Sequence, residues 1–319
     1  MSTGNNVIAP NGPPSSNSAT LDGLDPVGEP QRDDRTSGLL LAAAGVLTFS
    51  FTLPMTKIAV RGFDPIVTAT GRAAVAGILA FGIIAVVKPN RPTWSQVRRL
   101  MWVIGGVVVG FPLLTSYALQ STGSMHGSVV NGLLPLATAG MAVVRAGERP
   151  STRYWACSAA GFGAVLAFVI VEGGGGLHRA DVLLVMAVLA AAIAYTEGAL
   201  LAREMGGWQV ITWALALASP VAIVVTIIGI RHTGLNATPG QWAAFGYTAI
   251  FSMLLGFFGW YAGLARAGIA RAGQLQLAQP ALSLMWGWPL LGESLSTAAV
   301  VAVVVVLGAV AVGRTAVVR

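Results

Sequence analysis

The chain has 319 residues, of which 55% are hydrophobic and only 10% are charged, and its formal net charge is +7. Ordinary soluble domains contain roughly 25% charged residues, so this apolar excess rules out a soluble globular protein and predicts a membrane protein. The positive charge does not indicate a nucleic-acid partner, because the basic residues lie in short gaps between apolar runs and form no patch. The single cysteine, Cys157, excludes an internal disulfide and a thiolate metal centre.

Residues 1–36 are rich in Pro, Ser, Asn, Gly and Asp and show no apolar periodicity. This composition cannot bury enough apolar surface to fold, so we predict a disordered cytoplasmic tail. The segment also lacks the basic and then apolar layout of a cleaved signal peptide.

Ten apolar segments follow, each close to the roughly 20 residues that cross a bilayer as a helix. They cover residues 38–60, 64–87, 98–119, 125–147, 151–171, 180–202, 208–230, 240–264, 271–291 and 295–314. The predicted fold class is therefore an all-α membrane protein with ten transmembrane helices in two inverted five-helix repeats. The predicted domains are repeat 1 at 37–172, a Gly-rich linker at 173–178 and repeat 2 at 179–315.

The distribution of Lys and Arg predicts the orientation of the chain. With the N-terminus in the cytoplasm, 14 of the 19 Lys and Arg residues fall on the cytoplasmic side, 4 fall outside, and Arg72 lies within a helix. We therefore expect a multi-pass protein of the inner membrane with both termini in the cytoplasm.

A stretch of the chain occurs twice, at 123–148 and at 268–293, with a constant offset of 145 residues (268−123). The offset aligns Pro135 with Pro280 and Glu148 with Glu293. Because five helices precede the second repeat, the two copies run in opposite directions through the membrane. Proline-interrupted hydrophobic segments in matching positions of two halves are typical of the central site of a secondary transporter, and inverted halves give a physical basis for alternating access.

These patterns resemble the EamA-type transporters of the drug/metabolite transporter superfamily. The resemblance rests on the segment Arg61-Gly-Phe-Asp-Pro65 leading to Arg72, and on Gly147-Glu148 and Gly292-Glu293 with the serines and glycines that follow them. It covers about residues 38–314. It implies ten helices in two inverted repeats and export of small metabolites, amino acids or toxic compounds. It implies no cofactor, and the oligomeric state is left open.

The candidate substrate site lies on the fourth and ninth predicted helices. Asn131, Pro135 and Thr138 share one helical face. The equivalent face in the second repeat consists of Gln276, Pro280 and Ser283, with Gln279 beside them. Each proline lacks an N–H, which should free the carbonyls of Asn131 and Gln276. One interpretation is a two-fold polar site in a central cavity, which the symmetry favours; the other is hydrogen bonding between helices.

Other residues are candidates for the cavity wall. Thr52 contributes to a mildly polar stripe on the first helix, and Tyr117 and Tyr195 are candidates for stacking on a ligand. Trp260 and Trp288 are instead expected to anchor helix ends at the membrane interface.

Two charges within the apolar runs are functional candidates, because burial of charge in a membrane is costly. Arg72 either contacts substrate or bonds to helix ends. Glu197 either carries a coupling proton or pairs with Arg203 near the surface. For Glu148 and Glu293 we expect a structural role, each close to the N-terminus of the following helix with Ser151 or Ser296 as the cap.

The chain contains no phosphate-binding loop and no hydrolase motif, so we expect neither direct use of ATP nor an enzyme. The predicted function is secondary active export of a small organic metabolite, with protons as the candidate coupling ion. The alternatives are a gradient-independent facilitator or uptake permease, and a non-transporting membrane receptor or partner.

Overall fold

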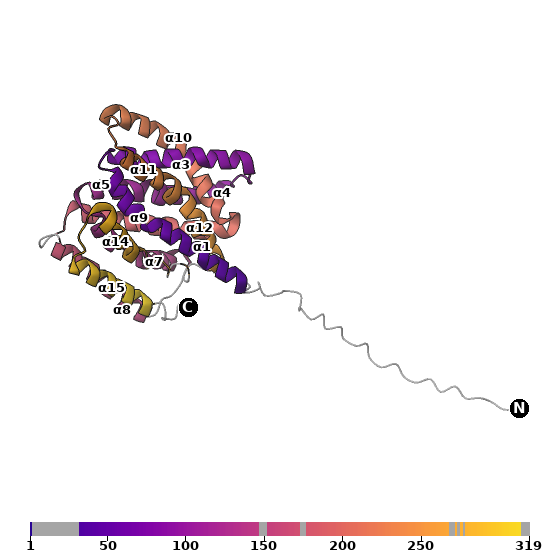
Figure 1. Ribbon diagram of the computed structural model, residues 1–319. Helices are drawn as coiled ribbons and strands as arrows, with labels where there is room; N and C mark the ends of the chain where they lie inside the picture. Colours follow the sequence, from indigo (N-terminus) through magenta and orange to yellow (C-terminus); the bar gives the residue numbers. More distant parts are fainter. Residues whose placement is uncertain are drawn as a thin grey trace.

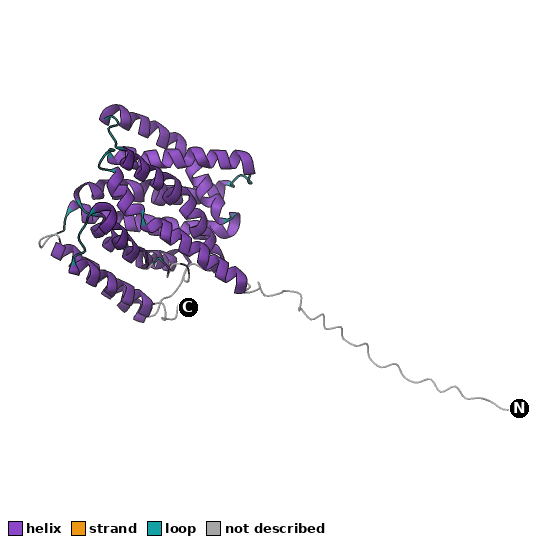
Figure 2. Ribbon diagram, viewed as in Figure 1, coloured by secondary structure: helices purple, strands orange, loops and turns teal. Residues whose placement is uncertain are grey.

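The computed structural model describes residues 1, 32–146, 152–172, 177–267, 272, 275–276 and 278–313. Within these residues the secondary structure is helical and contains no strand, and the helices form one bundle (Figures 1 and 2). The predicted tail and the glycines at 173–176 lie outside the described residues, apart from the last few residues of the tail, which begin the first helix.

The helices of the first half are α1 (Arg32–Ser50), α2 (Thr52–Ala59), α3 (Pro65–Val87), α4 (Trp94–Val103), η1 (Ile104–Gly110), α5 (Phe111–Ser121), α6 (Ser124–Asn131), α7 (Leu134–Ala146) and α8 (Thr152–Glu172). Those of the second half are α9 (Arg179–Met205), α10 (Gly207–Thr233), α11 (Pro239–Tyr247), η2 (Thr248–Leu255), α12 (Gly256–Ala267), α14 (Ala278–Leu291) and α15 (Thr297–Gly313). The two η segments are π-helical turns that continue the helices around them.

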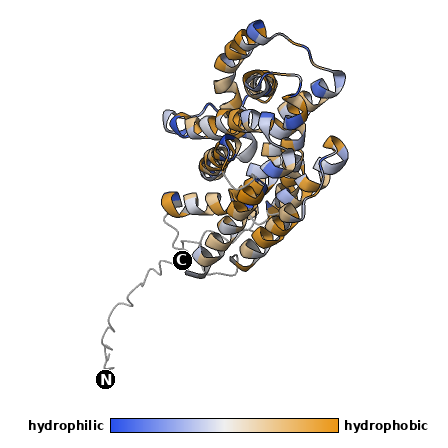
Figure 3. Ribbon diagram, turned by 90° about the vertical axis from the view of Figure 1, so that its left-hand side faces the viewer, coloured by the Kyte–Doolittle hydropathy of each residue, from blue (hydrophilic) through white to orange (hydrophobic). Residues whose placement is uncertain are grey.

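Seven helical stretches of the described chain are long and apolar enough to cross a membrane. They begin at Thr36, Pro65, Trp94, Ser124, Arg179, Gly207 and Pro239 and match seven of the ten predicted segments. The helices α8, α14 and α15 occupy the positions of the other three, but the apolar parts of α8 and α15 are shorter, so the count of ten spans stays a prediction. Large apolar side chains are exposed on α10 and α15, which suits contact with lipid. Hydrophobic residues dominate much of the ribbon (Figure 3).

Local features recur at the offset of 145 residues. The π-helical segment η1, shifted by 145, covers 249–255 and coincides with η2 (248–255). Thr93 and Gln96 form a capping box at the start of α4, and Thr238 and Gln241, 145 residues later, form the same box at the start of α11. Such a box satisfies free N–H groups at a helix start.

The contacts between helices follow the same offset. Helix α3 packs on α10, and α8 packs on α15; in each pair the second helix is the first shifted by 145 residues (Figure 1). The contact of α1 with α12 corresponds to that of α9 with α5, and the contact of α1 with α14 corresponds to that of α9 with α7. The two halves are therefore built alike and pack through equivalent surfaces.

Small residues set the closest approach between α1 and α12. A Cβ added to Gly259 would lie 2.7 Å from the Leu41 carbonyl oxygen, and one added to Gly263 would lie 2.6 Å from the Ala42 Cβ. Glycine allows this backbone contact, the usual way in which helices associate where apolar burial cannot drive them together.

Candidate functional site

The first membrane helix is broken where α1 ends at Ser50 and α2 begins at Thr52. Pro54 has no N–H to donate to the Ser50 carbonyl, so that oxygen needs another partner. The Ser283 hydroxyl of α14 donates to it at 2.6 Å, and Gln279 Nε2 donates to the Phe49 carbonyl at 3.4 Å. Two of the predicted substrate-binding side chains on α14 thus hold the break in the first helix.

A small cavity, here called the central cavity, lies beside this break. Its lining residues are Phe49, Thr52, Arg72, Val107, Phe111, Leu134, Ala191, Tyr195, Ser252, Phe257 and Gln279. They come from both halves of the chain. The cavity volume is about 20 Å³, which is enough for roughly one water molecule and too small for an organic ligand. The described conformation is therefore closed around its centre.

The uncharged polar groups of the central cavity include three of the predicted site residues. The Thr52 and Ser252 hydroxyls are hydrogen-bonded to each other at 2.8 Å, across the two halves. Gln279 leaves its Oε1 buried without a hydrogen-bond partner among the described residues. The ring of Tyr195 lies against Phe257 at a centroid distance of 6.0 Å.

Among the described residues that line the central cavity, Arg72 is the one that carries a charge. It projects from α3 and is only 2% exposed, and its Nε and Nη1 atoms are buried with no hydrogen-bond partner in the described part of the chain. These two nitrogens therefore do not bond to carbonyls or helix ends, which was the alternative role expected for Arg72.

Other predicted residues lie at the helix breaks instead of in the cavity lining. The helix that contains Pro135 is broken between Asn131 and Leu134, just before the proline. Asn131, Thr138 and Gln276 are buried, and each has an atom without a partner among the described residues, but none of them lines the central cavity.

In the second half, Gln276 forms a turn just before α14, and one expectation there needs correction. The Gln276 carbonyl accepts from Gln279 N at 3.0 Å and so is not left free. A Cβ on Gly132 would lie 3.4 Å from the Pro280 side chain, so the break before Pro135 contacts α14. Pro135, Pro280 and Ser283 do not line the central cavity in this conformation, and their role in substrate binding stays a prediction.

The aromatic residues also differ from expectation. Trp260 is fully buried and lies 5.5 Å from Tyr195 between ring centroids, so it is a core residue and not an interfacial anchor. Trp288 is 66% exposed, as an anchor would be. Trp286, in contrast, stacks on Phe51 at 4.4 Å and donates to the Ser50 hydroxyl.

Glu197 belongs to an ion-pair cluster at the end of the bundle that the Lys and Arg distribution assigns to the cytoplasm. Its carboxylate is 2% exposed and accepts from Arg99 Nε at 3.2 Å and from Arg145. Arg99 also binds Glu204. Its partners are thus Arg99 of α4 and Arg145 of α7, not the predicted Arg203. The cluster ties three helices together.

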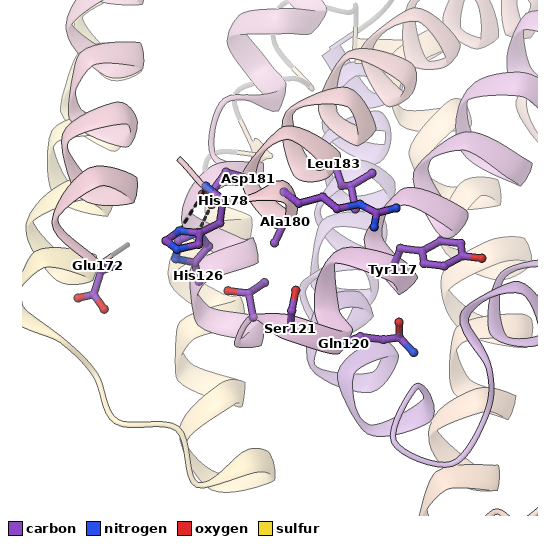
Figure 4. Close-up of a pocket in the computed structure, with 11 residues that line it drawn as sticks. Tyr117, Gln120, Ser121, His126, Glu172, His178, Ala180, Asp181 and Leu183 are labelled. Atoms are coloured by element: carbon purple, nitrogen blue, oxygen red, sulfur yellow. Dashed lines mark hydrogen bonds and ion pairs between the residues drawn. The ribbon is translucent and has the colours of Figure 1, made fainter. Parts of the chain in front are cut away.

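A larger cavity, here called the outer pocket, lies at the opposite end of α9, about 16 residues or roughly 24 Å from Glu197. Its volume is about 820 Å³, and Tyr117 lines it, so Tyr117 does not belong to the central cavity (Figure 4). His126, His178 and Asp181 point toward one another there, with His126 Nε2 2.6 Å from Asp181 Oδ1. The His126 side chain is therefore paired and only 16% exposed.

Glu293 caps a helix, but not the one expected. Its carboxylate accepts from Ser124 N at 2.7 Å, Met125 N at 2.8 Å and the Ser124 hydroxyl at 3.0 Å, so it caps α6 in the other half of the chain. The start of α15 is capped by Ser296, whose hydroxyl accepts from Ala299 N. Glu148 and Ser151 lie outside the described residues.

Several functional residues were missed from the sequence. Ser252, Phe257 and Phe49 line the central cavity, and Arg99 and Arg145 hold Glu197. Ser252 is the one with a usable signal, because a hydroxyl inside an apolar run needs a partner. Among the described residues, no group of three His, Cys, Asp or Glu is arranged to hold a metal ion.

The fold has a counterpart among solved structures. One crystal structure, described only as that of a protein, superposes with a TM-score of 0.61 over 87% of this chain and 96% of its own, at 19% identity. At that identity the likeness supports the fold alone.

Two further comparisons concern the family. The chain is 41% identical over 287 residues to the uncharacterized transporter YdeK of Bacillus subtilis (strain 168), covering 88% of this chain and 97% of that protein. The model of the EamA-like transporter family matches twice, at residues 36–170 and 178–313. The two family matches together span nearly the whole helical fold, and the relative covers 88% of the chain. The chain therefore belongs to the EamA-like transporter family.

Proposed function

We propose that this protein is a secondary transporter that exports a small organic molecule across the inner membrane by alternating access. One observation carries the proposal: a small cavity with both polar and aromatic walls is lined by residues from the two halves, whose helix contacts repeat at one constant offset. Substrate sites of transporters with repeated halves lie at such an interface near the middle of the membrane.

The mechanism follows from an inverted arrangement of the halves. Five helices per half place the two copies antiparallel in the membrane, so each half can take up the conformation of the other. Exchange of the two conformations moves the opening of the central cavity from one side to the other. The ion pairs of Arg99 and Arg145 with Glu197 join α4, α7 and α9 at the end that we assign to the cytoplasm, and we expect them to separate when substrate loads from that side.

Glu197 is also the candidate for proton coupling, because it is a buried carboxylate inside a membrane span. The competing candidate is a gradient-independent facilitator or uptake permease, in which Glu197 only closes the cytoplasmic end. The ion pairs of Glu197 make this distinction testable, because a structural role is shared with the two arginines and a coupling role belongs to the carboxylate.

The test is transport in proteoliposomes, with a mixed panel of amino acids and small metabolites, with and without an imposed pH gradient. We expect gradient-driven accumulation by the unaltered protein. Loss of gradient dependence in Glu197→Gln, with dependence retained in the Arg99→Gln/Arg145→Gln double variant, would assign coupling to Glu197.

If both variants lose gradient dependence equally, Glu197 has only a structural role at the cytoplasmic end. Equilibration that is indifferent to pH would replace the exporter with a facilitator. No movement of any compound under either condition would contradict the proposed function.

A further inference from the structure

The buried guanidinium of Arg72 is not fully hydrogen-bonded in the described structure. Its guanidinium is buried on α3, and two of its nitrogens, Nε and Nη1, have no hydrogen-bond partner among the described residues. A buried polar group without a partner is unfavourable, and a buried charge without one is far more so. Such a group needs a counter-charge.

The chain itself does not supply that counter-charge in the described part. No Asp or Glu lines the central cavity. The buried carboxylates among the described residues are already engaged: Glu197 binds Arg99 and Arg145, and Asp181 binds His126. The described part of the chain thus leaves Arg72 without a counter-charge, which an anion bound from outside can supply.

The remainder of the central cavity indicates what else the anion carries. Phe49, Phe111 and Phe257 give it aromatic walls. The polar groups beside Arg72 are uncharged: the Thr52 and Ser252 hydroxyls, Gln279 and Tyr195. Gln279 Oε1 is left as an unused acceptor. One cationic anchor within largely aromatic walls suits a molecule with one acidic group and an apolar body.

We propose that Arg72 binds the carboxylate of a small organic monoacid with an aromatic or aliphatic body. The planar guanidinium fork matches a carboxylate in a bidentate geometry, which a lysine cannot reproduce. This inference rests on the proposed function, because the closed cavity of about 20 Å³ must widen before it admits more than a water-sized group.

The experiment measures ligand binding to the full chain in nanodiscs, by calorimetry and by the shift in thermal unfolding. The probes are phenylacetate, its neutral counterpart phenylacetamide, and chloride. We expect saturable binding of phenylacetate, weak or no binding of the amide and none of chloride. Arg72→Gln should weaken phenylacetate binding roughly tenfold or more, since it removes one partner of a buried charged pair. Arg72→Lys should recover part of the affinity.

The control is Arg231→Gln, which removes an exposed arginine at the end of α10 and should bind like the unaltered protein. Without ligand, Arg72→Gln should unfold at an equal or higher temperature, because it removes an unpaired buried charge. If Arg72→Gln does not fold, Arg72→Lys and the comparison of acid with amide on the unaltered chain decide the question.

Three results would overturn the inference: equal binding of acid and amide, phenylacetate affinity unchanged in Arg72→Gln, or chloride binding as tightly as the acid, which would make an inorganic anion the ligand. Failure of the site is distinguishable from failure of the transport function. Transport of neutral or cationic compounds that is unaffected by Arg72→Gln would reject the site and keep the function. Binding of the acid without transport of any compound would keep the site and reject the transport function.

Discussion

Glu293 shows how one side chain joins the two halves of the chain. It lies just beyond α14, yet it accepts from two backbone N–H groups and one hydroxyl at the start of α6. A carboxylate at a helix N-terminus satisfies free N–H groups and is favoured by the helix dipole.

We expect Glu293→Gln to lower the stability by about 1 kcal/mol, because the amide keeps the shape but loses the charge-assisted hydrogen bonds. The measurement is the apparent Tm in nanodiscs. Glu172→Gln, which alters an exposed carboxylate at the end of α8, is the matched control and should leave the Tm unchanged. An equal Tm for both variants would show that the cap contributes nothing.

At the scale of elements, the packing of η1 on α9 depends on one glycine. A Cβ on Gly106 would lie 2.3 Å from the Ala190 carbonyl oxygen, whereas one on the neighbouring Gly105 would meet nothing within 4 Å. Overpacking of this kind forces backbone shifts.

Gly106→Ala should therefore lower the stability by about 1–3 kcal/mol, whereas Gly105→Ala should leave it unchanged or slightly higher. Thermal unfolding of the two variants side by side tests this prediction, because they differ by one position in the same segment. Similar loss in both would point to backbone propensity in the π-helical turn as the cause, and not to contact with α9.

The cluster around Glu197 predicts an asymmetry between its members. Removal of the carboxylate in Glu197→Gln leaves Arg99 and Arg145, whose side chains are 26% and 46% exposed, so water can solvate them. Removal of both arginines leaves the Glu197 carboxylate without an ion-pair partner although its side chain is only 2% exposed.

We expect the Arg99→Gln/Arg145→Gln double variant to cost about 3 kcal/mol or more, and Glu197→Gln only about 1 kcal/mol. Chemical unfolding of each variant measures the difference. Arg98→Gln/Arg203→Gln, which alters two exposed arginines at the same end, is the matched control. A larger cost for Glu197→Gln would reject this account of the cluster.

For the whole molecule, the orientation in the membrane is open to a direct test. The chain has one cysteine, so a Cys157→Ser background carries no reactive thiol. We expect Gln120→Cys, an exposed position in the lining of the outer pocket, to react with a membrane-impermeant maleimide in intact cells. Ser95→Cys, at the exposed start of α4, should react only after permeabilisation. The reverse pattern would invert the predicted orientation.

Much of the fold is encoded locally and was predictable. Apolar runs of about 20 residues predict membrane-spanning helices. Lipid offers no hydrogen-bond partner to backbone N–H and C=O groups, and a helix pairs these groups within itself. Seven of these spans agree with the structure within a few residues. The constant offset predicted the likeness of the halves, and the EamA resemblance agrees with the family match. Arg72, Thr52, Tyr195 and Gln279 were site candidates on separate grounds of charge, polarity, aromatic character and repeat position, and all four line the central cavity.

The sequence by itself determined that the chain is a duplicated helical membrane protein of this family, because hydrophobic length, charge in the gaps and repeat spacing are properties of the chain alone. Only the tertiary structure decided which polar groups meet. The Ser283 hydroxyl donates to the Ser50 carbonyl, which Pro54 leaves free and which lies more than two hundred positions earlier in the chain. Glu293 caps α6, and Glu197 forms ion pairs with Arg99 and Arg145. Inside a bundle each polar group bonds to whichever partner packing brings within about 3 Å, and periodicity does not encode that choice.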